Sequence, residues 1–185
     1  MIALIVSASS SLAQKDEPHR DAEKLPEMQI TDAGLLAIDT PKGFKRVDGP
    51  GLASFVPERE LNKKQPGVLI YVSCVPIGPS ESNKDFESAI EADINAFKTA
   101  YKSGSVKKEE DLDLPRAKHH APRYTMMSGQ EKNGFEQIVF IDDGERVLIL
   151  VLSTRNQTDF ARSLPTFQGF ARSYGGSVIL GPKVK

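Results

Sequence analysis

Residues 67–104 read GVLIYVSCVPIGPSESNKDFESAIEADINAFKTAYKSG, which is an apolar run, a break and an amphipathic run. The apolar run, Gly67–Ile77, predicts a strand whose side chains alternate between the two faces of a sheet. Both faces are apolar: one carries Val68, Ile70, Val72 and Cys74, and the other carries Leu69, Tyr71 and Val75. Such a strand belongs in the interior of a sheet that is at least partly covered on both sides.

The amphipathic run, Asp85–Lys102, predicts a helix. Large apolar side chains recur every three or four residues and form one stripe of Phe86, Ile90, Ile94, Phe97 and Tyr101. Ser82 and Asp85, three residues apart, resemble a helix start, and Gly104 ends the pattern. We expect the stripe to lie against a sheet face, with Phe97 fully buried there.

Shorter strand patterns lie on both sides of this unit. Before it, Leu35–Ile38 and Leu52–Val56 predict two short strands, with a turn at Pro41–Phe44. After it, the pattern predicts an antiparallel meander with a hairpin at Lys132-Asn133-Gly134. The strands of the meander are Val106–Leu114 at a charged edge, Arg123–Gln130, Phe135–Ile141 and Arg146–Leu152. The last is apolar on both faces, which predicts a central position.

A second helix closes the pattern, with Phe160, Leu164, Phe167, Phe170 and Tyr174 as its apolar residues. Because proline breaks a helix interior, we expect Pro165 in the first turn and Ser163 as the N-cap. The sequence therefore predicts an α+β fold, a mostly antiparallel twisted sheet with a long helix after the third strand and a closing C-terminal helix. It predicts one domain over residues 34–176, after a disordered lead at 14–33 and before a tail at 177–185.

The order of these elements resembles a known fold group. Pro41–Phe44 after the first strand, the long helix Phe86–Tyr101 and the closing Phe167–Tyr174 resemble the Mog/PsbP-like α/β/α sandwich. This group includes the PsbP extrinsic subunit of photosystem II and many small exported bacterial proteins. The resemblance covers most of residues 34–174 and implies an accessory or binding subunit rather than an enzyme. No functional motif comes with it, and the chain has none of the features that would assign it to photosystem II.

The first residues indicate export. Ile2–Val6 is a short apolar run, and Ser11-Leu12-Ala13 places small residues three and one positions before a cleavage site after Ala13. We interpret residues 1–13 as the remnant of a signal peptide, with an ordinary flexible N-terminus as the alternative. Export predicts a periplasmic or secreted protein. No run approaches the roughly 20 apolar residues of a membrane span, so no transmembrane segment is predicted.

Composition excludes some partners. The formal net charge is −1, and lysine and arginine are scattered among the acidic residues, so no basic stripe exists to bind nucleic acid. Cys74 is the one cysteine, which precludes an internal disulfide. Because Cys74 lies in an apolar strand pattern, we expect a buried and inert thiol.

Three constellations were candidates for chemistry, and none assigns a site. His119 and His120 are adjacent and point to opposite faces of a strand, so both rings cannot chelate one ion without a sharp turn. Asp142-Asp143 lies before Gly144 between two apolar strands, which is typical of a turn. Cys74 has no histidine partner that the sequence can identify, and no Gly-x-Ser-x-Gly nucleophile motif occurs. The sequence therefore predicts no catalytic, cofactor-binding or metal-binding residues, and no cofactor.

Three classes of function stay open at this stage. The sequence favours an exported, non-enzymatic accessory module of the cell envelope that binds a protein partner. The alternatives are a small-ligand carrier, with a pocket between the sheet and the Phe86–Tyr101 helix, and an enzyme whose site one sequence does not reveal. A pocket, buried convergent titratable groups or an exposed apolar patch would distinguish them. The sequence does not indicate an oligomeric state.

Overall fold

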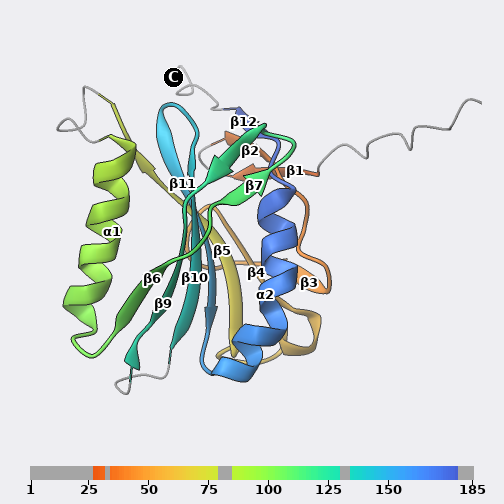
Figure 1. Cartoon of the computed structure of the whole chain (residues 1–185). Coiled ribbons are helices and arrows are strands. Elements are labelled where there is room, and N and C mark those ends of the chain that lie inside the picture. Colours follow the sequence, from red (N-terminus) through yellow and green to blue (C-terminus); the bar gives the residue numbers. More distant parts are fainter. Residues whose placement is uncertain (1–26, 32–33, 79–84, 130–133, 179–185) are drawn as a thin grey trace, which may run out of the picture.

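A seven-stranded antiparallel sheet forms the centre of the molecule (Figure 1). The structure is a computed structural model, and it describes residues 27–31, 34–78, 85–129 and 134–178. From one edge to the other, the sheet consists of β3 (Phe44–Val47), β4 (Ala53–Pro57), β5 (Val68–Pro76), β11 (Arg146–Thr154), β10 (Phe135–Asp142), β9 (Arg123–Met127) and β6 (Ser105–Lys108). β11 lies in the middle, between β5 and β10, as its two apolar faces predict.

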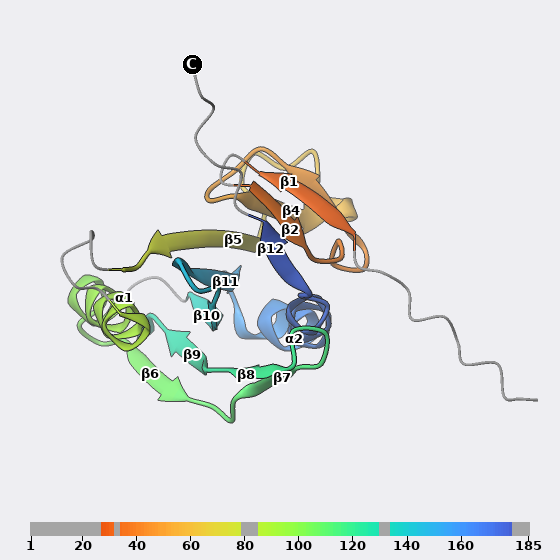
Figure 2. The same cartoon turned by 90° about the horizontal axis from the view of Figure 1, so that it is seen from above.

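Each face of this sheet carries one helix, α1 (Phe86–Ala100) on one side and α2 (Gln157–Arg172) on the other (Figure 2). The α2 side is also covered by two small sheets. One consists of β1 (Met28–Thr31), β2 (Gly34–Ala37) and β12 (Gly176–Val178), and the other of β7 (Leu112–Leu114) and β8 (His119–Ala121). A 3-10 turn, η1 (Glu58–Glu60), follows β4. This arrangement confirms the predicted α+β fold with two helices flanking a mostly antiparallel sheet.

The alternation predicted for β5 is confirmed by the two cores. Val68, Ile70 and Val72 belong to the cluster on the α2 side, together with Phe167 and Phe170. Tyr71 and Val75 pack against the cluster on the α1 side, which contains Ala89, Ile90, Met126, Ile138, Phe140, Val147, Ile149 and Val151. The sheet is therefore covered on both faces, as a doubly apolar central strand requires.

Both predicted ends of the domain are wrong. β1 lies within residues 14–33, where the composition predicts a disordered lead, yet it pairs with β2 along its whole length and buries Gln29 and Thr31. At the other end, β12 includes Ser177 and Val178, which the sequence places in the tail, because it pairs with the other edge of β2. Strands of three or four residues are too short to show a clear alternation of apolar and polar side chains. Their hydrogen-bonded pairing with a neighbouring strand in the structure reveals them instead. Residues 1–13 lie outside the described residues.

α2 begins earlier than the sequence predicts. Its N-cap is Asn156 rather than Ser163, and the Asn156 side chain accepts a hydrogen bond of 2.8 Å from the Asp159 N–H. Pro165 consequently lies inside the helix, where it removes the hydrogen bond to the carbonyl of Ala161. Ala161 is exposed, so water can bind that carbonyl instead.

The predicted edge strand Val106–Leu114 is two separate strands. β6 forms the charged edge of the large sheet, as expected. Leu112 and Leu114 instead belong to β7, which leaves that sheet, pairs with β8 and buries both leucines in the α2-side core. Burial of these two side chains therefore outweighs continued pairing along the sheet edge.

Candidate functional site

The face of the sheet under α1 is only partly covered, and this is where the chain leaves a cavity. α1 starts with a capping box in which the Ser88 N–H donates to the Asp85 carboxylate at 2.8 Å and the Ser88 hydroxyl accepts from the Asp85 N–H. Asp85 is therefore the N-cap, and Ser82 of the predicted start lies outside the described residues. The buried residues of α1 are Ala89 and Ile90, both in its first half.

The second half of the α1 stripe is less buried than the sequence predicts. Phe97 and Tyr101 are half-buried, so the expectation that Phe97 is fully buried is wrong. Their rings lie 4.9 Å apart between centroids and are tilted by 52°. The stripe exists and faces the sheet, but α1 is anchored at its N-terminal half and leaves space beside its C-terminal half. We name this space the α1 groove.

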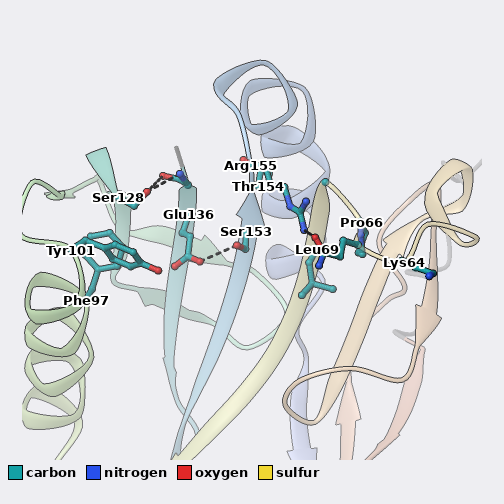
Figure 3. Close-up of a pocket in the computed structure, with 13 residues that line it drawn as sticks. Lys64, Pro66, Leu69, Phe97, Tyr101, Ser128, Glu136, Ser153, Thr154 and Arg155 are labelled. Carbon is teal, nitrogen blue, oxygen red and sulfur yellow. Dashed lines mark hydrogen bonds between the residues drawn. The ribbon is translucent and has the colours of Figure 1, made fainter. Parts of the chain in front are cut away.

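The α1 groove consists of two adjoining cavities that share Phe97 and Glu136. The larger has a volume of about 710 Å³ and extends from the end of α1 across β10, β11 and β5 to the segment 64–67 (Figure 3). The smaller, of about 250 Å³, lies under α1 and includes Tyr71 and Asp93. Small-molecule sites commonly have volumes of about 300–1,000 Å³ and mostly apolar walls, which the larger cavity matches.

One wall of the α1 groove depends on a buried carboxylate. Glu60 of η1 accepts hydrogen bonds from the Gly67 N–H at 2.6 Å and from Lys63 Nζ at 3.1 Å. Burial acts to raise the pKa of Glu60, but these donors outweigh it and hold that pKa below its ordinary value. The carboxylate thus fixes the 60–67 segment, and Lys64, Gln65 and Pro66 line the larger cavity from there.

Two other carboxylates face the α1 groove itself. Glu136 projects from β10 and accepts a hydrogen bond of 2.9 Å from the Ser153 hydroxyl on β11 (Figure 3). Asp93 projects from α1. Burial raises the pKa of both carboxyl groups, and the charge of Asp93 raises that of Glu136 further. Burial, with the charges of Glu136 and Asp93, also raises the pKa of Tyr71 to about 12.

Neither groove carboxylate has a cationic partner in the described part of the chain. The ion pairs formed there by lysine, arginine and histidine involve other acidic residues. Arg155 and Lys64 line the larger cavity, but on its β5 side, and Arg155 donates to Gln65 Oε1 at 3.0 Å. Half-buried carboxylates without a counterion destabilise the fold, and such groups are concentrated at functional sites.

The residues that the sequence singles out do not meet in this groove. His119 and His120 lie on β8, where the ring Nε2 of His119 is buried without a hydrogen-bond partner and His120 is exposed near Asp113. Cys74 lies in β5 as predicted but is only partly buried, because it packs at the margin of the α2-side core. Among the described residues, no group of three or more histidine, cysteine or acidic side chains could hold a metal ion.

Asp143 has a larger role than a turn residue. Gly144 donates to Asp142 Oδ1 at 2.9 Å, which is the predicted turn chemistry. Asp143, however, accepts hydrogen bonds from the hydroxyls of Tyr174 and Ser177 and from Arg146 Nε at 2.9 Å. This network ties the β10–β11 hairpin to β12 and the end of α2, so it stabilises the C-terminal segment.

Sequence reasoning missed Asp93 and Glu136, although each carries a weak signal. Asp93 lies three residues after Ile90 and four before Phe97, which places a carboxylate on the apolar stripe of the helix. Glu136 lies two residues before Ile138, on the strand face that turns toward α1. A charged side chain on a predicted core face is the feature that would have indicated the site.

Comparison with known proteins finds likeness in structure only. No protein-family model matches the chain, and no curated protein matches it in sequence. The solution structure of cyanobacterial PsbP (CyanoP) from Synechocystis is 15% identical, has a TM-score of 0.48, and the match covers 86% of this chain and 96% of that one. LpqN of Mycobacterium tuberculosis, described as involved in cell envelope biogenesis, is 12% identical with a TM-score of 0.49, covering 76% and 83%.

The Ran-binding protein Mog1p of Saccharomyces cerevisiae is also similar, at 10% identity and a TM-score of 0.45, covering 75% of this chain and 81% of that one. Two of these structures, CyanoP and Mog1p, bear the names of the fold group that the sequence resembles. At these identities the likeness concerns the fold alone. Neither α1 nor α2, the helices of the described residues, is long and apolar enough to cross a bilayer.

Proposed function

We propose that the protein is a non-enzymatic binding module that holds a small, largely apolar ligand in the α1 groove. The observation that carries the proposal is the cavity of about 710 Å³, whose walls combine Phe97, Tyr101 and Leu69 with polar and charged side chains. Convergent polar groups in a mostly apolar cavity are the usual composition of a ligand site. Of the classes left open by the sequence, this is the carrier with a pocket between sheet and helix.

The surface offers less support for a protein partner as the main ligand. Among the described residues, the large apolar side chains that are exposed are Met28 of β1, Leu61 after η1 and Met127 of β9, in three separate parts of the chain. Protein-binding surfaces are marked by contiguous apolar patches rather than by single exposed side chains. Binding to an envelope protein stays a prediction, and so does export, for which the Ser11-Leu12-Ala13 pattern is the support.

The groove carboxylates favour binding over catalysis. A general acid and a general base need environments that separate their pKa values, so that one is protonated while the other is ionised. Burial raises the pKa of both Asp93 and Glu136, in the same direction and for the same reason. These upward shifts assign neither carboxyl group a distinct role as acid or base.

A neutral fluorescent probe tests the proposal. N-phenyl-1-naphthylamine brightens in apolar sites, and we expect saturable binding to the native protein with one probe per chain. Leu69→Trp places a larger side chain in the cavity wall and should weaken probe binding at least tenfold. Leu61→Trp is the matched control, because Leu61 is 45% exposed and does not line the cavity.

Absence of saturable binding to the native protein would overturn the proposal. Equal loss of binding in both variants would also overturn it, since the probe site would then not be the α1 groove. Circular dichroism of the two variants at the measurement temperature establishes that each is folded.

A further inference from the structure

The α1 groove has an acidic side, formed by Asp93 and Glu136, and a separate basic side, formed by Lys64 and Arg155. Asp93 reaches the groove from the helix and Glu136 from the sheet, so the two carboxylates face the same space from opposite walls. They are close enough for their charges to interact, because the charge of Asp93 raises the pKa of Glu136. Two acidic groups on different elements, both directed at one cavity, create a local negative potential in a partly desolvated site.

The hydrogen bonding of Glu136 leaves it able to bind a donor. Ser153 donates to Glu136 Oε1 and orients the carboxylate in the cavity. Within the described residues, no hydrogen bond reaches the other oxygen, Oε2. A carboxylate held by one neutral hydroxyl, with its second oxygen exposed to the cavity, is suited to a charge-assisted hydrogen bond from a ligand.

Aromatic side chains surround the acidic side. Phe97 of α1 and Tyr101, the C-cap of that helix, extend into the larger cavity on the side where Glu136 lies (Figure 3). Tyr71 lines the smaller cavity with Asp93. The faces of aromatic rings attract cations, and quaternary ammonium groups are recognised by clusters of such rings. Ile138, Ile149 and Val151 form an aliphatic wall of the smaller cavity.

From the carboxylates, aromatic rings and aliphatic wall that meet in the α1 groove, we infer that the ligand is an organic cation with an apolar body. An alkylamine or an alkyl quaternary ammonium compound has this form. The inference rests on the proposed function and specifies its ligand. The charged head lies beside Glu136 and Phe97, which both cavities share, with Asp93 in the smaller cavity and Tyr101 in the larger. The apolar body extends along Leu69. The basic residues Lys64 and Arg155 stand at the other side of the cavity, so they do not compete for the carboxylates.

A hydrated metal ion fits these walls less well. Calcium takes six to eight oxygen ligands, and magnesium requires an octahedral set. The described groove residues supply two carboxylates, and no group of three or more histidine, cysteine or acidic side chains among the described residues could hold a metal ion. An organic cation instead uses all three parts of the site, which are the carboxylates, the rings and the aliphatic wall.

Competition for the bound N-phenyl-1-naphthylamine tests the inference with two ligands of equal chain length. Octyltrimethylammonium carries the charge and 1-octanol does not. We expect the cation to displace the probe from the native protein at concentrations at least tenfold lower than the alcohol requires. In the double variant Asp93→Asn and Glu136→Gln this preference should fall to less than threefold, while displacement by 1-octanol stays unchanged.

The matched control is the double variant Glu87→Gln and Glu91→Gln, which changes the net charge of the protein equally. Glu87 and Glu91 are exposed residues of α1 that do not line either cavity. We expect this control to keep the full preference for the cation. Equal loss in both double variants would assign the preference to net charge and would overturn the inference.

The failure of the inference is distinguishable from the failure of the proposed function. If the probe binds in the α1 groove and both competitors displace it equally, the groove is a binding site but its ligand is not a cation. If the probe does not bind, the proposed function fails as well. The amide variants keep the shape of the side chains, and thermal melts establish that they fold.

Discussion

The two faces of the central sheet are packed to different degrees. On the α2 face, Phe167 is fully buried, and the rings of Phe170 and Phe55 pack edge to face with 5.6 Å between their centroids, so helix and sheet interlock. On the α1 face, Phe97 is half-buried and two cavities separate the second half of the helix from the strands. Both helices carry apolar stripes of similar length. The difference teaches that an amphipathic stripe indicates which way a helix faces, not how completely it closes on the sheet.

The two helices also differ in what the sheet presents to them. The α2-side core of β10 and β11 contains Val139, Ile141, Leu148 and Leu150, all buried. The α1 side carries Glu136 and Ser153 at the same end of these strands. The α1 face therefore retains polar groups that a ligand can use, at the end of the strands where the helix does not close on the sheet.

The largest expected effect compares one aromatic residue from each helix. Phe167→Ala should lower the free energy of unfolding by about 3–5 kcal/mol, because it removes a fully buried ring and leaves a cavity. Phe97→Ala should cost about 1–2 kcal/mol, since a half-buried ring loses only part of its transfer free energy. Urea denaturation of both variants measures the difference.

Lys98→Ala serves as the control for this pair, because Lys98 is exposed and follows Phe97 directly. It should change stability by less than about 0.5 kcal/mol. Equal costs for Phe97→Ala and Phe167→Ala would mean that the α1 face is as tightly packed as the α2 face, and the groove would then not exist in solution.

A smaller effect, of opposite sign, is expected from Glu136→Gln. The pKa of Glu136 is raised in the folded protein by burial and by Asp93, so the folded state holds this proton more tightly than the unfolded chain does. The contribution of Glu136 to the free energy of unfolding therefore falls as the pH rises from the ordinary pKa of 4.5 through the raised pKa of the folded state. At pH values above the raised pKa the contribution stays low. Glu136→Gln removes this penalty and should be more stable than the native protein at pH 7.

Thermal melts at pH 4 and pH 7 measure this effect, with Glu87→Gln as the exposed control. The gain of Glu136→Gln should be much smaller at pH 4, where the native side chain is mostly protonated in both states. Asp93 and Tyr71 are the other titratable groups facing Glu136, and neither changes this sign. A variant that is less stable than the native protein at pH 7 would mean that the ionised carboxylate stabilises the fold, contrary to its buried, unpaired setting.

Much of the fold could be predicted because it depends on the spacing of apolar and polar side chains along the sequence. The two faces of β5, the central place of β11 and the stripe of α1 all follow from apolar spacing. The start of α2 could not be predicted, because the capping hydrogen bond of Asn156 and the burial of the helix outweigh the cost of Pro165. Nor could β1 and β12, which exist through their pairing with β2.

The candidate site was predictable only in position. The sequence proposes a pocket between the sheet and the Phe86–Tyr101 helix as one alternative, and a cavity lies there. The carboxylates that give it chemical character come from β10 and α1, which are more than 40 residues apart in the chain and share no motif. Only the folded arrangement brings Asp93 and Glu136 to one space, so spacing along the chain does not reveal them.

The most direct test of the central claim asks which face of the sheet binds the ligand. Amide chemical shifts of the ¹⁵N-labelled native protein can be followed by NMR while octyltrimethylammonium is added. We expect saturable shifts in the second half of α1, at the Glu136 end of β10, at Ser153–Arg155 and in residues 64–69, with α2 unchanged. Shifts centred on α2 and the β1–β2–β12 sheet, or no saturable shifts, would contradict the account.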